Sequence, residues 1–189
     1  MAGRRYDPER RRRLVDAAVR VVADRGIAGV SHRRVAREAD VPLGSTTYHF
    51  ASLDDLLGAA LRQISEEWLA GMERWDRRTD PALPLADALT GLVLEWLAGD
   101  RTRTRLEYEL YLAALNHERL RPLAAECLDG LTALLHRRTG DEATARALTA
   151  LLDGLTLQFL LTDRPADPQT IRTLVARLTG PGPAGDGGL

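Results

Sequence analysis

The chain has 189 residues, of which 44% are hydrophobic and 28% charged, a composition typical of a globular protein. No apolar run approaches the roughly 18 residues that a bilayer span needs, and the charged N-terminus has no apolar core behind it. We therefore expect neither a membrane span nor a signal peptide. A single cysteine, Cys127, excludes an internal disulfide. These features together predict a soluble, cytoplasmic protein with no membrane partner.

The net charge of −1 is unevenly distributed along the chain. Residues 1–50 hold eleven arginines and six acidic residues, a net charge of +5, whereas the remainder holds 15 arginines and 21 acidic residues, a net charge of −6. A basic N-terminal part on an acidic body suits a part that meets phosphates. A solvated basic face without a partner is the alternative.

Helical periodicity recurs along the chain and strand signals are nearly absent, so the sequence predicts an all-α protein. A first helix is expected over residues 8–25. A short second helix is expected over 32–39, with Ser31 as a suitable N-cap. Pro42 suits the first position of a third short helix, which reaches about Phe50.

A long fourth helix is expected to open after Ser52, because Ser52 and Asp55 form a variant of the capping box with Asp in place of Glu. It ends near Arg78. Further helices are expected at about 85–98, 102–116, 120–139, 142–162 and 168–179. The last ten residues contain five Gly and two Pro, which predicts a disordered tail at 180–189. The expected domains are residues 1–52, residues 53–179 and this tail.

The second and third helices are joined by a tight turn, as in a helix-turn-helix, whose later helix enters the major groove of DNA. Gly44 lets the backbone approach DNA closely, and the hydroxyls of the three residues after it can contact bases or phosphates. Tyr48 and His49 can donate hydrogen bonds to phosphate oxygens. A three-helix bundle with no role in DNA binding is the alternative.

The segment from Asp40 to Leu56 also matches a known sequence pattern. That pattern is roughly Gly-Val-Ser-x-Gly-x-Leu-Tyr-x-His-Phe-x-Ser-Lys-x-x-Leu, and the chain agrees with it at Val41, Gly44, His49, Phe50, Ser52 and Leu56. Upstream, the agreeing residues are Ala17, Ala18, Gly26, Ser31, Val35 and Ala36. Over about residues 10–60 the chain thus resembles the TetR-type (TetR/AcrR-like) regulators. The resemblance implies an N-terminal DNA-binding domain joined by the fourth helix to a helical domain for ligand binding and dimerisation.

Two departures from the pattern concern phosphate contacts. Thr46 and Thr47 replace the usual Leu-Tyr, whose tyrosine contacts phosphate in the family, and Tyr48 can take over that contact. Leu53 replaces a frequent lysine, and arginines at positions 4, 5, 33, 34 and 37 can compensate. The predicted DNA-binding residues are Arg4, Arg5, Ser31, His32, Arg33, Arg34, Leu43, Gly44, Ser45, Thr46, Thr47, Tyr48 and His49.

The resemblance further implies that the later helices enclose a ligand cavity and that the last two form a dimer interface. The helix at 142–162 is apolar on nearly all sides, so it must be buried on several of them. The predicted interface residues are Leu148, Leu151, Leu152, Leu155, Phe159, Ile171, Leu174, Val175 and Leu178. Burial within the core of a single protomer is the alternative.

An effector pocket is expected where aromatic side chains and single polar groups stand on apolar helix faces. The candidates are Trp68, Met72, Trp75, Trp96, Tyr108, Tyr111, His117, Cys127 and Gln158. Many of these can instead be core residues. Binding at such a pocket could swing the fourth helix and change the spacing of two DNA-reading domains.

Catalysis is not expected, because the four histidines lack metal-ligand spacing and Cys127 lacks a nucleophile signature. We accordingly expect no metal and no cofactor. The function that the sequence predicts is a ligand-responsive repressor that binds a palindromic double-stranded DNA operator as a homodimer and is released by a small, largely apolar effector. The alternative is a DNA-binding protein of the same fold that senses no small molecule and is regulated by a protein partner.

Overall fold

The computed structural model describes residues 8–162 and 164–180, and every regular element within them is a helix. The predicted all-α fold is therefore confirmed. The chain divides into two compact units. Of the described residues, unit 1 contains 8–67 and 102–126, and unit 2 contains 68–101 and 127–180 apart from residue 163.

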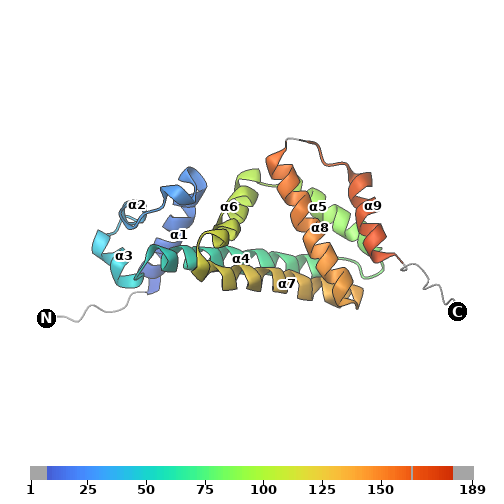
Figure 1. Cartoon of the computed structure of the whole chain (residues 1–189), viewed down its shortest axis with the longest axis horizontal. Helices are drawn as coiled ribbons and strands as arrows, with labels where there is room; N and C mark the ends of the chain where they lie inside the picture. The colour runs from blue at the N-terminus through green and yellow to red at the C-terminus, as the bar shows by residue number, and fades with distance from the viewer. Residues whose placement is uncertain (1–7, 163, 181–189) are drawn as a thin grey trace. The chain divides into compact units, whose positions relative to one another are not determined.

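Three helices open unit 1: α1 (Pro8–Arg25), α2 (His32–Glu38) and α3 (Leu43–His49), which lie together in the blue and cyan part of Figure 1. Gly26 ends α1 with a positive φ of 67°, a conformation that glycine adopts without steric cost. A single 3₁₀ turn (Ile27–Gly29) leads into α2. Each of the three helices packs against the other two, as a helix-turn-helix domain requires.

The rest of unit 1 comes from three later segments, with a shared apolar core. The first part of α4 (Leu53–Arg78), most of α6 (Arg101–Leu112) and the start of α7 (Arg121–Thr139) belong to it. Their core is one cluster with α1, in which Leu14, Leu57 and Leu110 are fully buried. Burial of such side chains stabilises each by about 1.5–3 kcal/mol.

The expected helices at 102–116 and 120–139 are shortened by 3₁₀ turns. The chain tightens to 3₁₀ at Ala113–Leu115, directly after α6, and again at Glu118–Leu120, directly before α7. The amides of Asn116 and His117 both donate to the carbonyl of Ala113 at 3.0 Å, so the helix closes here instead of continuing.

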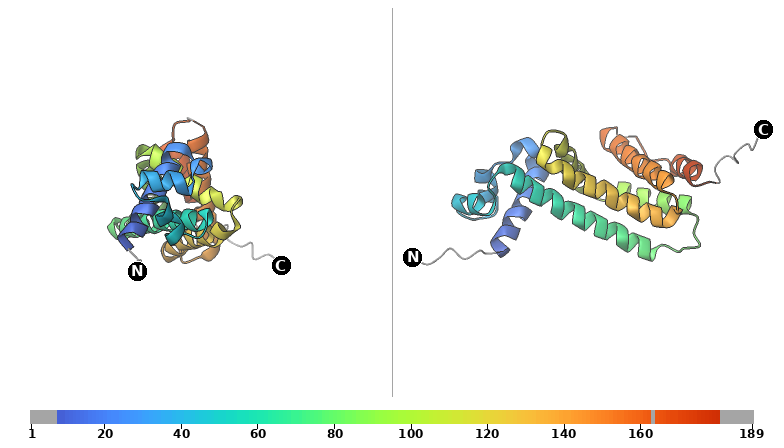
Figure 2. Two further views of the ribbon diagram at one scale, coloured as in Figure 1. Left: turned by 90° about the vertical axis from the view of Figure 1, so that its left-hand side faces the viewer. Right: turned by 60° about the horizontal axis from the view of Figure 1, so that its bottom comes forward.

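Unit 2 contains the end of α4, α5 (Leu85–Ala98), most of α7, α8 (Glu142–Leu161) and α9 (Pro168–Thr179). Helix α5 packs against α8 and α9, which also pack against each other. Figure 2 shows α8 and α9 as the two orange-to-red helices of this unit. The core contains the buried side chains of Leu89, Leu134, Leu148 and Val175.

Within unit 2, α4 and α7 approach each other closely at a glycine. A Cβ at Gly130 would lie 2.8 Å from a methyl carbon of Leu69, so only glycine fits there without a shift. Arg138 of α7 then donates from Nε to the Asp76 carboxylate at 2.5 Å and from Nη2 to the Asp76 carbonyl at 2.7 Å. Its guanidinium also stands 5.8 Å from the ring centroid of Trp75.

The predicted domain boundaries separate a DNA-binding part from a ligand-binding and dimerisation part. The compact units divide the chain differently, because α6 packs in the same core as α1. Residues 181–189 of the predicted tail lie outside the described residues. Among the described helices, none is long and apolar enough to cross a membrane.

Candidate DNA-binding surface and effector site

The turn between α2 and α3 is held by its own backbone. Ser31 caps α2, because its Oγ accepts a hydrogen bond from the amide of Arg34 at 3.2 Å. At the other end, the amide of Val41 donates to the carbonyl of Ala36 at 2.9 Å, and Asp40 turns the chain with a φ of 51°. Asp tolerates this left-handed conformation better than most residues do, and it stands where the TetR-type pattern has glycine.

Helix α3 presents only part of its predicted surface to solvent. Gly44, Thr47, Leu43 and Tyr48 are exposed, the last two to 43% and 47%. Thr46, in contrast, is fully buried, and its Oγ1 donates to the carbonyl of Leu43 at 2.7 Å. Ser45 is also buried.

This burial corrects two of the predicted DNA contacts. The side chains of Ser45 and Thr46 face the core of the domain, so their hydroxyls cannot read bases. Thr47 keeps an exposed hydroxyl, whose bond to the carbonyl of Gly44 is long at 3.4 Å. His49 is half-buried and packs edge-on against Tyr48, with ring centroids 5.1 Å apart.

The predicted DNA-contact residues at α2 differ in their exposure to solvent and in their hydrogen-bond partners. Arg33 is exposed. Arg34 is half-buried and its guanidinium donates to the carbonyl of Gly29, while Ser31 serves as the helix cap. His32 is half-buried at the first position of α2. Arg4 and Arg5 lie outside the described residues.

Two arginines of α1 contact the ends of α2 and α3. The sequence pattern did not identify either of them. Arg20 Nε donates to the carboxylate of Glu38, the last residue of α2, at 2.8 Å. The Arg11 guanidinium stands 5.1 Å from the ring centroid of Phe50, the buried residue that ends α3. Both contacts join residues far apart in sequence, so helical periodicity carries no signal for them.

The predicted capping box at the start of α4 is present. The amide of Asp55 donates to Ser52 Oγ at 3.1 Å, and the amide of Ser52 donates to the Asp55 carboxylate at 2.9 Å. The hydrogen bonds from Ser52, helped by the nearby Arg119, hold the pKa of Asp55 below its usual value. The capping box fixes where the helix after α3 begins.

Four predicted effector residues meet in unit 2. Met72 and Trp75 of α4 are buried, and Trp68 of α4 and Trp96 of α5 pack partly buried against the same cluster. The rings of Trp68 and Trp96 have centroids 5.9 Å apart and are tilted by 44°. These four residues, which we call the tryptophan cluster, give the core of unit 2 an aromatic and polarisable part.

The other predicted pocket residues are elsewhere. Tyr108 and Tyr111 lie edge to face in unit 1, with centroids 6.1 Å apart, and His117 of that unit contacts the Asp54 carboxylate through Nδ1 at 2.8 Å. Cys127 is partly buried in unit 2. Gln158 is exposed on α8, so its side chain is not part of the interior of unit 2.

The predicted dimer interface separates into core and surface residues. Leu148, Leu152, Ile171 and Val175 are already buried inside the protomer, as the alternative allowed, and so cannot contact a partner directly. The remaining five are half-buried: Leu151, Leu155, Phe159, Leu174 and Leu178. Leu161, at the end of α8, is 81% exposed.

No group of three His, Cys, Asp or Glu side chains within the described ranges is arranged to hold a metal ion.

Comparison with known families decides the classification. A family model described as "Bacterial regulatory proteins, tetR family" matches residues 14–60, and one described as "Tetracyclin repressor-like, C-terminal domain" matches residues 80–181. The chain belongs to the TetR family. It is a DNA-binding transcription regulator.

Among TetR-family relatives, the chain is similar to the regulator BetI of Paraburkholderia xenovorans, with 30% identity over 84% of this chain and 85% of the relative. It is also similar to the nicotine-responsive repressor HdnoR of Paenarthrobacter nicotinovorans, with 25% identity over 85% of this chain and 88% of the relative. These relatives are named as transcription regulators.

Solved structures are more similar. The multidrug binding protein EbrR complexed with imidazole is 57% identical, with a TM-score of 0.86 over 95% of this chain and 99% of that one. EbrR complexed with ethidium is 56% identical, with a TM-score of 0.81 over 90% and 98% of the two chains. A TetR-family member from Streptomyces coelicolor A3 is 57% identical, with a TM-score of 0.77 over 91% and 99%.

Proposed function

We propose that this TetR-family protein is a ligand-responsive repressor that binds a palindromic operator as a homodimer and is released by a small aromatic effector. The observation that carries the proposal is its 56–57% identity, over nearly the whole chain, to EbrR structures complexed with ligands. We assign DNA reading to the helix-turn-helix in unit 1, where the tetR family model matches residues 14–60, and ligand binding to unit 2.

On the DNA side, the exposed part of α3 carries base choice. Thr47 can offer its hydroxyl or its methyl group to a base edge, and Gly44 lets the helix approach closely. Tyr48 and His49, with Arg33, hold phosphates and so set the register of the domain on DNA. Phosphate contacts by arginine also explain why a protein with a net charge of −1 keeps a basic N-terminal part.

On the ligand side, we infer that the effector is a flat aromatic cation. Structures of EbrR complexed with ethidium and with proflavin support this class. Trp68 and Trp96 of the tryptophan cluster are half-buried with ring centroids 5.9 Å apart, and tryptophan is the side chain that attracts cations most strongly through its ring. The sequence predicted a largely apolar effector. The proposed effector is more specific: an aromatic molecule that carries a positive charge.

We infer dimerisation because a single recognition helix contacts too few bases to specify an operator alone. The half-buried residues of α8 and α9, together with exposed Leu161, supply an apolar surface for a second copy of the chain. An apolar surface of this kind is unusual on a protein that stays monomeric. Two copies related by a twofold axis would read a palindrome.

The rival proposal is a DNA-binding protein of the same fold that a protein partner regulates. It predicts that aromatic cations bind no more tightly to the wild type than to a variant without the tryptophan cluster.

Selection from a random pool of duplex DNA tests the DNA side. We expect the full-length chain to enrich an inverted repeat whose half-sites are spaced by about one helical turn. A pool without an enriched sequence at moderate salt, or with a single unrepeated half-site, would contradict the proposal.

A further inference from the structure

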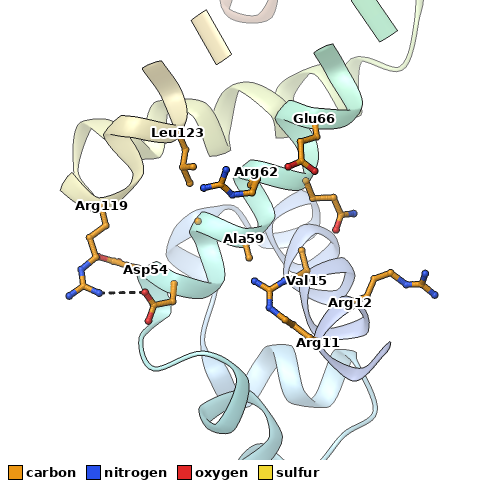
Figure 3. A pocket seen from close by; sticks show the side chains of 12 residues that line it. Arg11, Arg12, Val15, Asp54, Ala59, Arg62, Glu66, Arg119 and Leu123 are labelled. Atoms are coloured by element: carbon orange, nitrogen blue, oxygen red, sulfur yellow. Dashed lines mark hydrogen bonds and ion pairs between the residues drawn. The ribbon is translucent and has the colours of Figure 1, made fainter. Parts of the chain in front are cut away.

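A cleft of about 520 Å³ opens in unit 1 (Figure 3). It lies between α1, α4, the 3₁₀ turn before α7 and the first turn of α7. Its size falls in the range of small-molecule sites, about 300–1,000 Å³. The lining residues are Arg11, Arg12, Val15, Asp54, Asp55, Gly58, Ala59, Arg62, Gln63, Glu66, Arg119 and Leu123.

The lining of the cleft has a small apolar part and a larger charged part. Val15, Gly58, Ala59 and Leu123 supply carbon atoms and no side-chain polar group, whereas most of the other lining residues are charged. At Gly58 an added Cβ would lie 3.4 Å from Leu120 and 3.5 Å from Leu123, so α7 packs against α4 at this glycine. The lining therefore suits a ligand with a short aliphatic body and charged ends.

Most charges of the lining already have partners of their own. Asp54 contacts His117 at 2.8 Å, and Asp55 accepts from the Ser52 amide at 2.9 Å and from Arg119 at 3.4 Å. The remaining engaged groups pair along or across helices: Arg12 with Glu9 at 2.6 Å, Arg62 with Glu126 at 3.4 Å, and Gln63 with Asp16 at 3.0 Å. These groups gain less from a ligand, because they would exchange one partner for another.

One charge of each sign is left over. Among the described residues, Arg11 has no carboxylate partner and only its contact with the Phe50 ring, so its five N–H donors are available. Glu66 has neither an ion pair nor a hydrogen bond within the same described part of the chain. In Figure 3 these two residues come from different helices, Arg11 from α1 and Glu66 from α4, and both line the cleft.

We propose that this cleft binds a small zwitterion, whose carboxylate meets the Arg11 guanidinium and whose ammonium group meets Glu66. Guanidinium–carboxylate contacts can be bidentate and are about twice as strong as neutral hydrogen bonds. A simple anion bound to Arg11 would be repelled by the negative charge of Glu66. A simple cation bound to Glu66 would likewise be repelled by the positive charge of Arg11. The proposed class of ligand is therefore an amino acid with a short aliphatic chain between its charges.

This site differs from the effector site in place and in chemistry. All twelve lining residues belong to unit 1, whereas the tryptophan cluster belongs to unit 2. The proposal does not rest on the proposed function, and its test needs no DNA.

Isothermal titration of the full-length protein tests the site with unbranched amino acids that carry a terminal amine, from glycine to 6-aminohexanoate. The series varies the distance between the two charges. We expect one length to bind best, with hexanoate and hexylammonium binding about tenfold more weakly or worse, because each lacks one charge-assisted contact. Arg11→Gln and Glu66→Gln should each weaken the best ligand by a similar factor.

Two variants in unit 2 serve as controls. Arg146→Gln changes an exposed arginine of α8, and Trp96→Ala changes the tryptophan cluster. Both should bind the best amino acid as the wild type does. Absence of binding across the series, equal binding of hexanoate, or undiminished binding by Arg11→Gln and Glu66→Gln would each overturn the proposal.

Discussion

Thr46 and Thr47 are neighbours in α3 with opposite environments. Thr46 is fully buried, and its hydroxyl is bonded to the carbonyl of Leu43 at 2.7 Å. Thr47 is exposed, and its bond to the carbonyl of Gly44 is long at 3.4 Å. A one-residue step turns a helix by about 100°, which is enough to move a side chain from the core to the solvent-exposed side of the helix. We therefore expect separate roles for the two residues, with Thr46 in stability and Thr47 in the proposed DNA reading.

Substitution of each threonine by alanine should separate these roles. Thr47→Ala should change the preferred operator sequence, with a loss of about 1–3 kcal/mol if a base contact disappears. Thr46→Ala should lower the thermal stability of the protein and leave the sequence preference of the folded fraction as it was. Operator binding to a panel of single-base variants, beside a melting curve for each protein, measures both effects.

Tyr48→Phe is the matched control for a phosphate contact. It removes one hydroxyl from an exposed side chain and should weaken binding to all duplexes alike. If it changed the base preference while Thr47→Ala did not, the two roles would be reversed.

At the scale of the elements, α8 and α9 are capped by aspartates at their N-termini. Asp141 accepts from the amide of Thr144 at 2.7 Å, and Asp167 accepts from the amide of Thr170 at 3.0 Å. Hydrogen bonds from Thr144 and Thr170, respectively, hold the pKa of each carboxyl below its usual value. The ionised carboxylate also interacts favourably with the positive end of the helix dipole.

These lowered pKa values predict a stability that depends on pH. Because folding lowers each pKa, the stabilisation is present at neutral pH and is lost as the pH falls from about 4 through the folded value. The double variant Asp141→Asn and Asp167→Asn keeps the capping geometry without the charge. Its midpoint of urea unfolding should be below that of the wild type at pH 7, and the gap should narrow at pH 3.

Asp129→Asn in the middle of α7 is the control, since Asp129 is exposed and caps no helix. Its midpoint should follow that of the wild type at both pH values. A gap for the double variant that is the same at pH 7 and pH 3 would contradict the assigned role of the two caps.

The helices themselves could be predicted closely from local signals. The first helix, the fifth at 85–98 and the last at 168–179 have the predicted ends, because Gly26, Gly99 and Asp167 are strong stop or start residues. Around residues 113–120 the prediction failed, because a change from α to 3₁₀ geometry depends on packing and leaves no mark on the apolar period. The contacts of Arg11 with Phe50 and of Arg20 with Glu38 were missed for a related reason, since they join different helices.

At the scale of the whole molecule, the sequence does not show whether a broad apolar helix face packs inside its own protomer or against a partner. The stripe on α8 and α9 predicted a dimer interface, but four of its nine residues are buried in the core of their own protomer, and Leu151, Leu155 and Leu178 pack partly buried against it. Periodicity shows that a face must be covered and does not show by what. The half-buried remainder is the part that a partner can still cover.

Charge on that remainder should produce monomers. Leu155→Glu with Phe159→Glu places two carboxylates on the proposed interface, where an apolar partner surface cannot solvate them. Light scattering should report a monomer, and operator binding should be lost while circular dichroism still shows a helical protein.

Arg146→Glu is the control, because Arg146 lies nine residues before Leu155 and therefore on the opposite side of α8. It should remain a dimer. A dimer that survived in the double glutamate variant would place the interface elsewhere on the molecule.

The central claim is that a ligand in unit 2 releases DNA from unit 1. The most direct test is fluorescence anisotropy of the selected operator duplex, titrated with the protein in the presence and absence of malachite green, a ligand with which EbrR has been crystallised. The matched control is Trp68→Ala with Trp96→Ala, which leaves α1–α3 unchanged and so reveals any direct effect of the dye on DNA. We expect saturating ligand to weaken wild-type binding by about 5–150-fold, the usual range of allosteric coupling, and to leave the control unaffected. Equal operator affinity with and without bound ligand, or equal release from the control, would contradict the account.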